Sequence, residues 1–194
     1  MFAALFGLAG CADAAPGLPQ SEPPVPADSP SVSQPEDPED PEEEVPTPEP
    51  LPLPDYPEDL TAEDTAENAI LAAEYFLELM NYIQSTGDVA PFEEVAAQSC
   101  ESCERYVERQ EERYRSGGFS NGNHASMDSP KASRTEDGIA WVVASDWTIT
   151  DGTRYDAEEN VLKHIPGNEL MGHRMGVQLI ESEWKMLTFA KAPK

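Results

Sequence analysis

Apolar side chains recur every three or four residues from Thr61 to Ser85, the period that lines one face of an α-helix. These apolar positions are Ala66, Ala69, Ile70, Ala73, Phe76, Leu77, Met80 and Ile83. A second face carries Tyr75, Leu79 and Tyr82. Because two faces are apolar, we expect this helix to lie in a groove between other elements. We expect Gly87 to end it.

Two shorter helices are predicted after Gly87. Pro91 suits the first turn of a short helix, where its missing N–H leaves no hydrogen bond unmade. Ser99 is expected to cap a third helix that runs to about Arg115, with the apolar stripe Cys103, Tyr106, Val107, Gln110 and Tyr114. The pair Gly117-Gly118 ends the helical part of the chain.

Beyond Gly118 the pattern changes to a period of two, which is typical of β-strands. We predict strands over residues 123–134, 139–149, 171–179 and 184–190, with turns at Asp137-Gly138 and Asp151-Gly152. Residues 155–165 fit either a poorly patterned strand or a long loop. Helices followed by antiparallel strands predict an α+β fold, with the helices packed on one face of the sheet.

Charge is distributed unevenly along the chain. The 38 Asp and Glu residues exceed the 12 Lys and Arg residues, for a formal net charge of −26, and every basic residue lies at or after Arg105. Nucleic-acid binding needs a basic patch, and the sequence offers none. An acidic, solvated spacer in the first half explains the charge, although cationic partners or a divalent metal stay compatible with charge alone.

The first residues predict a lipid anchor. The apolar run Phe2–Ala9 and the sequence Leu8-Ala9-Gly10-Cys11 match the bacterial lipobox, in which the cysteine is acylated and becomes the new N-terminus. The apolar run is short and lacks a basic n-region, so we expect that the natural start lies upstream or that the sequence is clipped. We therefore assign residues 1–11 to a signal remnant and predict lipidation of Cys11 at the extracytoplasmic face of the cell membrane.

A proline- and acid-rich spacer follows, over residues 12–60. Such a composition buries too little apolar surface to offset the entropy of folding, which predicts disorder. Extended at about 3.1 Å per residue, the spacer could reach on the order of 150 Å and hold a domain of residues 61–194 away from the membrane. No apolar run approaches the ~20 residues of a transmembrane helix.

Cys100 and Cys103 allow four interpretations. Residues three apart on a helix are close enough for a disulfide, and an extracytoplasmic location favours oxidation. The Cys-x-x-Cys spacing also occurs in redox centres, although a helix rather than a strand precedes it here. Two thiolates supply half of a zinc site, but the three histidines are scattered. Two free thiols filling the core are the fourth interpretation; we favour the disulfide.

The chain resembles a family of small secreted lipoproteins of high-GC Gram-positive bacteria (actinobacteria) that is grouped as a domain of unknown function. The resemblance covers about residues 61–190 and rests on these segments: Ala73-Glu74-Tyr75-Phe76, Met80-Asn81-Tyr82, Ser85-Thr86-Gly87-Asp88, Cys100-Glu101-Ser102-Cys103, Tyr106, Tyr114 and Gly117-Gly118. It implies an NTF2-like fold, a cone in which a bent antiparallel sheet wraps a long first helix. It implies no activity, and it suggests face-to-face pairing of sheets in a homodimer.

A cone of this kind can hold a pocket between helix and sheet. Five amphipathic residues are candidates to line it: Tyr75, Tyr82, Trp141, Trp147 and His173. Each also fits an ordinary role in the core or pocket wall. NTF2-like ketosteroid isomerases place an Asp base opposite a Tyr acid, which here would be Asp146 and Tyr82. The sequence shows no Ser/His/Asp order, phosphate loop or EF-hand, so we predict no cofactor and no metal.

Two hypotheses for the function follow. The long spacer favours a lipid-anchored protein of the cell envelope whose folded domain binds a protein or small-molecule ligand without catalysis. The alternative is a small NTF2-like enzyme that uses the cone pocket as its active site. An open cavity between the Thr61–Ser85 helix and the Trp141 strand, with a buried carboxylate in it, would favour the enzyme.

Overall fold

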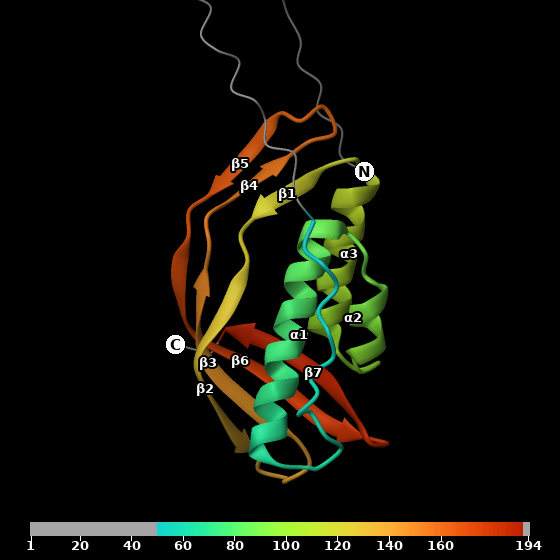
Figure 1. Ribbon diagram of the computed structural model, residues 1–194, viewed down its shortest axis with the longest axis vertical. Helices are drawn as coiled ribbons and strands as arrows, with labels where there is room; N and C mark the ends of the chain where they lie inside the picture. Colours follow the sequence, from blue (N-terminus) through green and yellow to red (C-terminus); the bar gives the residue numbers. More distant parts are fainter. Residues whose placement is uncertain (1–49, 192–194) are drawn as a thin grey trace, which may run out of the picture. The chain divides into compact units, whose positions relative to one another are not determined.

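A computed structural model describes residues 50–191 of the chain, apart from the Met171 side chain (Figure 1). The predicted lipidation of Cys11, the signal remnant and the spacer up to residue 49 lie outside these residues. Among the described residues, no helix has the length and apolar character needed to cross a membrane.

Within residues 50–191, three helices precede the strands, as predicted: α1 (Ala66–Thr86), α2 (Ala90–Val95) and α3 (Glu101–Arg115). Helix α1 begins later than predicted because Thr65, and not Thr61, is its N-cap. The Thr65 hydroxyl accepts a hydrogen bond from the backbone N–H of Asn68 at 3.2 Å. Gly87 ends α1 in the left-handed conformation (φ 75°), as the sequence predicted.

Seven antiparallel strands follow and form two connected sheets. The first sheet has the order β1-β4-β5 and consists of β1 (Phe119–Gly122), β4 (Gly152–Tyr155) and β5 (Val161–Ile165). The second has the order β2-β3-β6-β7 and consists of β2 (Ala125–Arg134), β3 (Trp141–Ile149), β6 (Asn168–Ile180) and β7 (Glu183–Lys191). This arrangement confirms the predicted α+β fold with antiparallel strands.

The two sheets meet at a bend, where three links join their strands. Strand β1 leads into β2, β3 into β4 and β5 into β6 through two-residue links (Figure 1). The β1–β2 link is hydrogen-bonded to the β3–β4 link: Asn123 N–H donates to Asp151 O at 2.8 Å, and Thr150 N–H donates to His124 O at 2.9 Å. The turn predicted at Asp151-Gly152 does separate two strands, but β3 and β4 lie in different sheets and do not pair as a hairpin. Residues 155–165 end β4 and form β5.

The core fills the interface between α1 and the four-stranded sheet. Its largest fully buried side chains include Phe76 and Ile83 from α1 and Val143, Met175 and Met186 from the sheet. The predicted α1 stripe is thus the packing face of the helix, and Leu79 on the second face is also fully buried. The region between α1 and β3, where the sequence hypothesis placed a pocket, is occupied by these side chains.

A cluster of three side chains fixes the start of α1 to the sheet. The Asp64 carboxylate accepts a hydrogen bond from Trp141 Nε1 at 2.7 Å and pairs with Arg134 Nη2 at 2.7 Å. The Arg134 guanidinium lies over the Trp141 ring, 4.1 Å from its centroid. These hydrogen bonds from Trp141 and Arg134 hold the pKa of the Asp64 carboxyl below its usual value.

Residues 50–60, which we call the strap, run along α1 (Figure 1). Leu51 N–H donates to Ser85 Oγ at 3.1 Å, the Tyr56 ring meets Tyr75 edge-on, and Leu60 is buried. Their proline-rich composition predicted that these residues belong to the disordered spacer. Their apolar side chains alternate with prolines and can pack on the helix, which explains why the ordered contacts reach back to Leu51.

Candidate functional site

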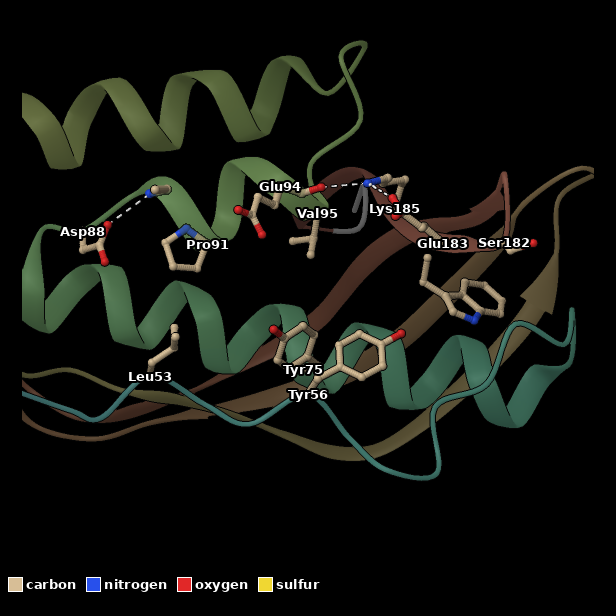
Figure 2. Close-up of a pocket in the computed structure, with 12 residues that line it drawn as sticks. Leu53, Tyr56, Tyr75, Asp88, Pro91, Glu94, Val95, Ser182, Glu183 and Lys185 are labelled. Carbon is tan, nitrogen blue, oxygen red and sulfur yellow. Dashed lines mark hydrogen bonds and ion pairs between the residues drawn. The ribbon is translucent and has the colours of Figure 1, made fainter.

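A groove of about 560 Å³ lies between the strap, α1, α2 and the turn that joins β6 to β7 (Figure 2). We call it the strap groove. Its walls carry apolar and aromatic side chains from all four elements: Leu53, Tyr56, Tyr75, Pro91, Val95 and Trp184. Besides the two tyrosine hydroxyls, its polar side chains are three carboxylates, one amine and one serine hydroxyl: Asp88, Glu94, Glu183, Lys185 and Ser182.

Two tyrosines form the floor of the groove. Tyr75 projects from the second face of α1, and Tyr56 reaches it from the strap with ring centroids 5.3 Å apart in an edge-on arrangement. Partial burial, together with the charge of Glu183 for Tyr56 and of Glu94 and Glu78 for Tyr75, raises the pKa of both phenols. Both rings therefore stay neutral at neutral pH and present their π faces and hydroxyls.

Negative charge dominates the rim of the groove. Lys185 Nζ pairs with Glu183 Oε2 at 2.6 Å and donates to the backbone carbonyl of Glu94 at 2.8 Å, as the dashed lines in Figure 2 show. Glu183 thus neutralises the charge of Lys185, which is the single amine that lines the groove. The Glu94 carboxylate has no hydrogen bond or ion pair to another described residue, and it points from α2 into the groove on the side of Tyr75. The groove keeps a net negative charge from Glu94 and Asp88.

The turn at the edge of the groove has an uncommon backbone. Glu181 and Ser182 both adopt positive φ (51° and 69°) in the two-residue connection between β6 and β7. Paired left-handed residues suit a tight hairpin, but Asn and Gly usually occupy them. A non-glycine residue there is strained, and such strain is concentrated at functional sites. The turn orients Ser182 and Glu183 at the groove.

The arrangement suits the binding of a cation with an apolar stem. Aromatic faces attract ammonium and guanidinium groups, most strongly where water is partly excluded. The Glu94 carboxylate can accept the hydrogen bonds of such a group, while Leu53, Pro91 and Val95 contact its methylene chain. Asp88 is held in place by Tyr82, whose hydroxyl donates to Asp88 Oδ2 at 2.9 Å.

The structure does not bring the five predicted pocket residues together. Tyr75 lines the strap groove, and Tyr82 reaches it only through Asp88. Trp141 belongs to the cluster with Asp64 and Arg134. Trp147 is buried and stacks on His173 across strands β3 and β6, with centroids 4.4 Å apart.

Asp146 and Tyr82, the pair proposed for an isomerase-like enzyme, each form a hydrogen bond with a different partner. Asp146 Oδ1 accepts a hydrogen bond from the backbone N–H of Gly172 at 2.7 Å, where β6 departs from regular pairing with β3. Tyr82 donates to Asp88 instead. Asp146 therefore has a structural role at an irregularity of the sheet.

Cys100 and Cys103 form a disulfide with Cα atoms 5.2 Å apart, as the favoured interpretation predicted. Both residues are buried, and Cys100 is the N-cap of α3. The sulfur of Cys100 accepts the backbone N–H of Cys103 at 3.2 Å. Within residues 50–191, no group of three or more His, Cys, Asp or Glu side chains is placed to hold a metal ion.

Sequence reasoning missed most of the groove. Leu53 and Tyr56 lie in the segment assigned to the spacer, and Glu94 and Lys185 were not singled out. One signal was present in the sequence: Leu51, Leu53, Tyr56 and Leu60 place apolar groups among the prolines just before α1. Such spacing indicates a packed segment, in contrast to the apolar-poor residues before it.

A family model described as "Family of unknown function (DUF6318)" matches residues 34–190. No curated protein is significantly similar to the chain. Among solved structures, the intermembrane space region of the chloroplast protein ARC6 is similar with a TM-score of 0.53 and 13% identity, over 68% of this chain and 99% of that one.

Two further solved structures are similar at lower TM-scores. Aln2 from a Streptomyces species has a TM-score of 0.42 and 12% identity, over 66% of this chain and 92% of that one. A "Putative calcium/calmodulin dependent protein kinase II association domain" from Xanthomonas campestris has a TM-score of 0.42 and 11% identity, over 68% of this chain and 91% of that one. The likeness to the ARC6 region concerns the fold alone, and it agrees with the α+β architecture, helices followed by antiparallel strands, that the sequence predicted.

Proposed function

The chain belongs to DUF6318, a family of unknown function, and we propose that it is a lipid-anchored binding protein of the cell envelope. Its folded domain holds lysine or arginine side chains of a partner protein in the strap groove. The observation that carries the proposal is the Glu94 carboxylate on the side of Tyr75, whose ring meets Tyr56 edge-on, in a groove with excess negative charge.

Charge and shape both favour a basic partner. The chain carries −26 overall, so a basic segment is attracted over a long range before it contacts the groove. The groove is open at its rim, and its apolar walls suit the methylene stem of lysine or arginine. A lysine side chain laid along Tyr75 would place its ammonium at Glu94.

The anchor is proposed from the sequence around Cys11. The Leu8-Ala9-Gly10-Cys11 segment supports acylation, and the long proline-rich stretch after it supports presentation of the domain at a distance from the membrane. A disulfide between Cys100 and Cys103 accords with an oxidising compartment. In this role the strap joins the tether to the groove, because its residues form one groove wall.

Exchanging Glu94 for glutamine is expected to weaken binding of an acetylated tri-lysine amide by about three- to tenfold. The variant removes the charge that faces the ammonium, keeps the shape of the side chain and leaves the cation–π contact with the tyrosines intact; a partly exposed ion pair with a charge-assisted hydrogen bond contributes roughly 0.5–1.5 kcal/mol. Isothermal titration calorimetry at two salt concentrations measures the effect, and the weakening should shrink at high salt.

Glu93→Gln is the matched control. Glu93 is exposed on the same helix, and its exchange removes the same charge, but its side chain does not line the strap groove. The affinity of this variant for the peptide should stay within a factor of about two of the unaltered chain. Equal weakening by both variants, or no binding of the peptide to the unaltered chain, would refute the groove as a cation site.

Replacing Cys11 with alanine is expected to move the protein from the membrane fraction to the soluble fraction of a Gram-positive host. The thioether-linked lipid is the only attachment that the proposal invokes, so its loss removes membrane affinity. Fractionation followed by mass spectrometry of the N-terminal peptide measures both outcomes. An unmodified Cys11 thiol in the mature, unaltered protein would contradict the anchor while leaving the groove proposal intact.

A further inference from the structure

Arg113 near the end of α3 has an unusual set of partners for so acidic a chain. Its Nη1 donates to two neutral oxygens, Gln110 Oε1 at 2.8 Å and Ser120 Oγ at 3.1 Å. No carboxylate of the described residues lies within ion-pair distance of it. By contrast, Arg115, two positions along, pairs with both Glu111 and Glu112.

Arg154 lies beside the same serine. It is the register partner of Ser120 in β1 and of Lys163 in β5. Directly opposed residues of antiparallel strands project from the same face of a sheet, so Ser120, Arg154 and Lys163 form one row across the three strands. Arg113 reaches the start of that row through its bond to Ser120.

The positive charges of this row are unbalanced. Neither Arg154 nor Lys163 has an ion pair with another described residue, and the Nε of Arg154 is buried with no hydrogen-bond partner among them. Partial burial, and then the charge of Arg154, hold the pKa of the Arg113 guanidinium below its usual value. Like charges this close destabilise a sheet unless a counter-charge lies between them.

The missing counter-charge has to accept several hydrogen bonds from different directions. Guanidinium groups match the oxygens of phosphate and carboxylate, and buried N–H groups without acceptors are rare in folded proteins. The donors here come from a helix and from neighbouring strands, so they do not lie in a single plane. A tetrahedral dianion can meet such an arrangement and balance two guanidinium charges, whereas a planar carboxylate carries a single charge.

We propose that Arg113, Arg154 and Lys163, with the Ser120 hydroxyl, form a binding site for a phosphate group. The Nη groups of Arg154 and the free N–H groups of Arg113 donate to its oxygens, Lys163 lies at the exposed end, and the buried Arg154 Nε–H reports on the bound guanidinium without contacting the phosphate. The site is separate from the strap groove in its elements and opposite in charge, so it does not depend on the function proposed for the groove.

Titration of the full chain with inorganic phosphate tests the site, with chloride at matched ionic strength as the reference. Side-chain ¹H–¹⁵N spectra follow the Arg154 Nε–H, which is expected to shift downfield with a saturable dependence on phosphate. Phosphatidylglycerol vesicles form a second arm. A response to free phosphate alone supports a soluble phosphate ligand, and a response to vesicles as well supports a lipid headgroup.

Variants separate a built site from general charge. Arg154→Gln is expected to lower phosphate affinity by about tenfold or more, and Lys163→Gln, at the exposed end, by about two- to fivefold. Lys163→Gln keeps the test decisive if the buried substitution fails to fold. Arg174→Gln removes an exposed charge from β6, in the other sheet, and should bind as the unaltered chain does. The proposal would be overturned if the Arg154 Nε–H resonance did not shift on addition of phosphate, or if all three variants lowered the phosphate affinity equally.

Discussion

Replacing Gly87 with alanine is expected to lower the free energy of unfolding by about 2–4 kcal/mol. Gly87 ends α1 at φ +75°, a conformation that costs an L-residue about 1–2 kcal/mol. An alanine Cβ would also overlap the ring of Tyr114, whose hydroxyl is held by the carbonyl of Gln84 at 2.8 Å. Overpacking of this kind adds about 1–3 kcal/mol. Urea unfolding followed by circular dichroism measures the loss.

Gly138→Ala separates the two causes. Gly138 also has positive φ (+73°), but an added Cβ would meet nothing within 4 Å. We expect this variant to lose only the backbone cost of about 1–2 kcal/mol. If the two alanine variants lose the same stability, the contact between Gly87 and the Tyr114 ring does not constrain the fold, and the packing of α3 on the end of α1 is looser than described.

Replacing Phe76 with alanine is expected to lower the free energy of unfolding by about 3–5 kcal/mol. Phe76 is 1% exposed and lies in the core between α1 and the four-stranded sheet. Removing its ring costs the transfer free energy of the ring and leaves a cavity that the packed neighbours cannot fill. Chemical unfolding measures the change, as for Gly87.

Ile139→Ala is the control for the core. Ile139 is 61% exposed in the turn between β2 and β3, so its truncation should change stability by less than about 0.5 kcal/mol. A loss below about 1 kcal/mol for Phe76→Ala would mean that the space under α1 already holds a cavity. That result would revive the alternative of an enzyme with its active site inside the cone.

Local patterns predicted the helices and the long strands because their periods report burial directly. The α1 stripe from Ala69 to Ile83 is buried where the 3.6-residue period placed it. The bend of the sheet was missed because a period of two continues across it, and Asp151-Gly152 resembles a hairpin turn. The segment forms a bend because Thr150 and Asp151 pair with His124 and Asn123, which are distant in sequence.

The groove could not be predicted in the same way. It assembles from four elements, and a residue's contribution depends on which segments come together in space. Composition made the strap resemble the rest of the spacer, although Tyr56 packs on Tyr75. Glu94 occupies an exposed position of a short helix, where the sequence pattern gives no reason to separate it from Glu93.

The cysteines show how far spacing alone can lead. A separation of three residues is compatible with a disulfide, a redox pair or half of a metal site. The sequence favoured the disulfide through the expected compartment, and the structure contains it. The compartment itself rests on Cys11, which is why the anchor needs a chemical test of its own.

The most direct test of the groove is a ¹H–¹⁵N titration of the full chain with acetylated tri-lysine amide. We expect the largest shifts at Tyr56, Tyr75 and Glu94, which come from three elements and meet only in the strap groove. Saturable changes confined to these residues and their neighbours would support the proposed cation site. Changes that are absent, or that follow the acidic side chains of the surface without preference for the groove, would contradict it.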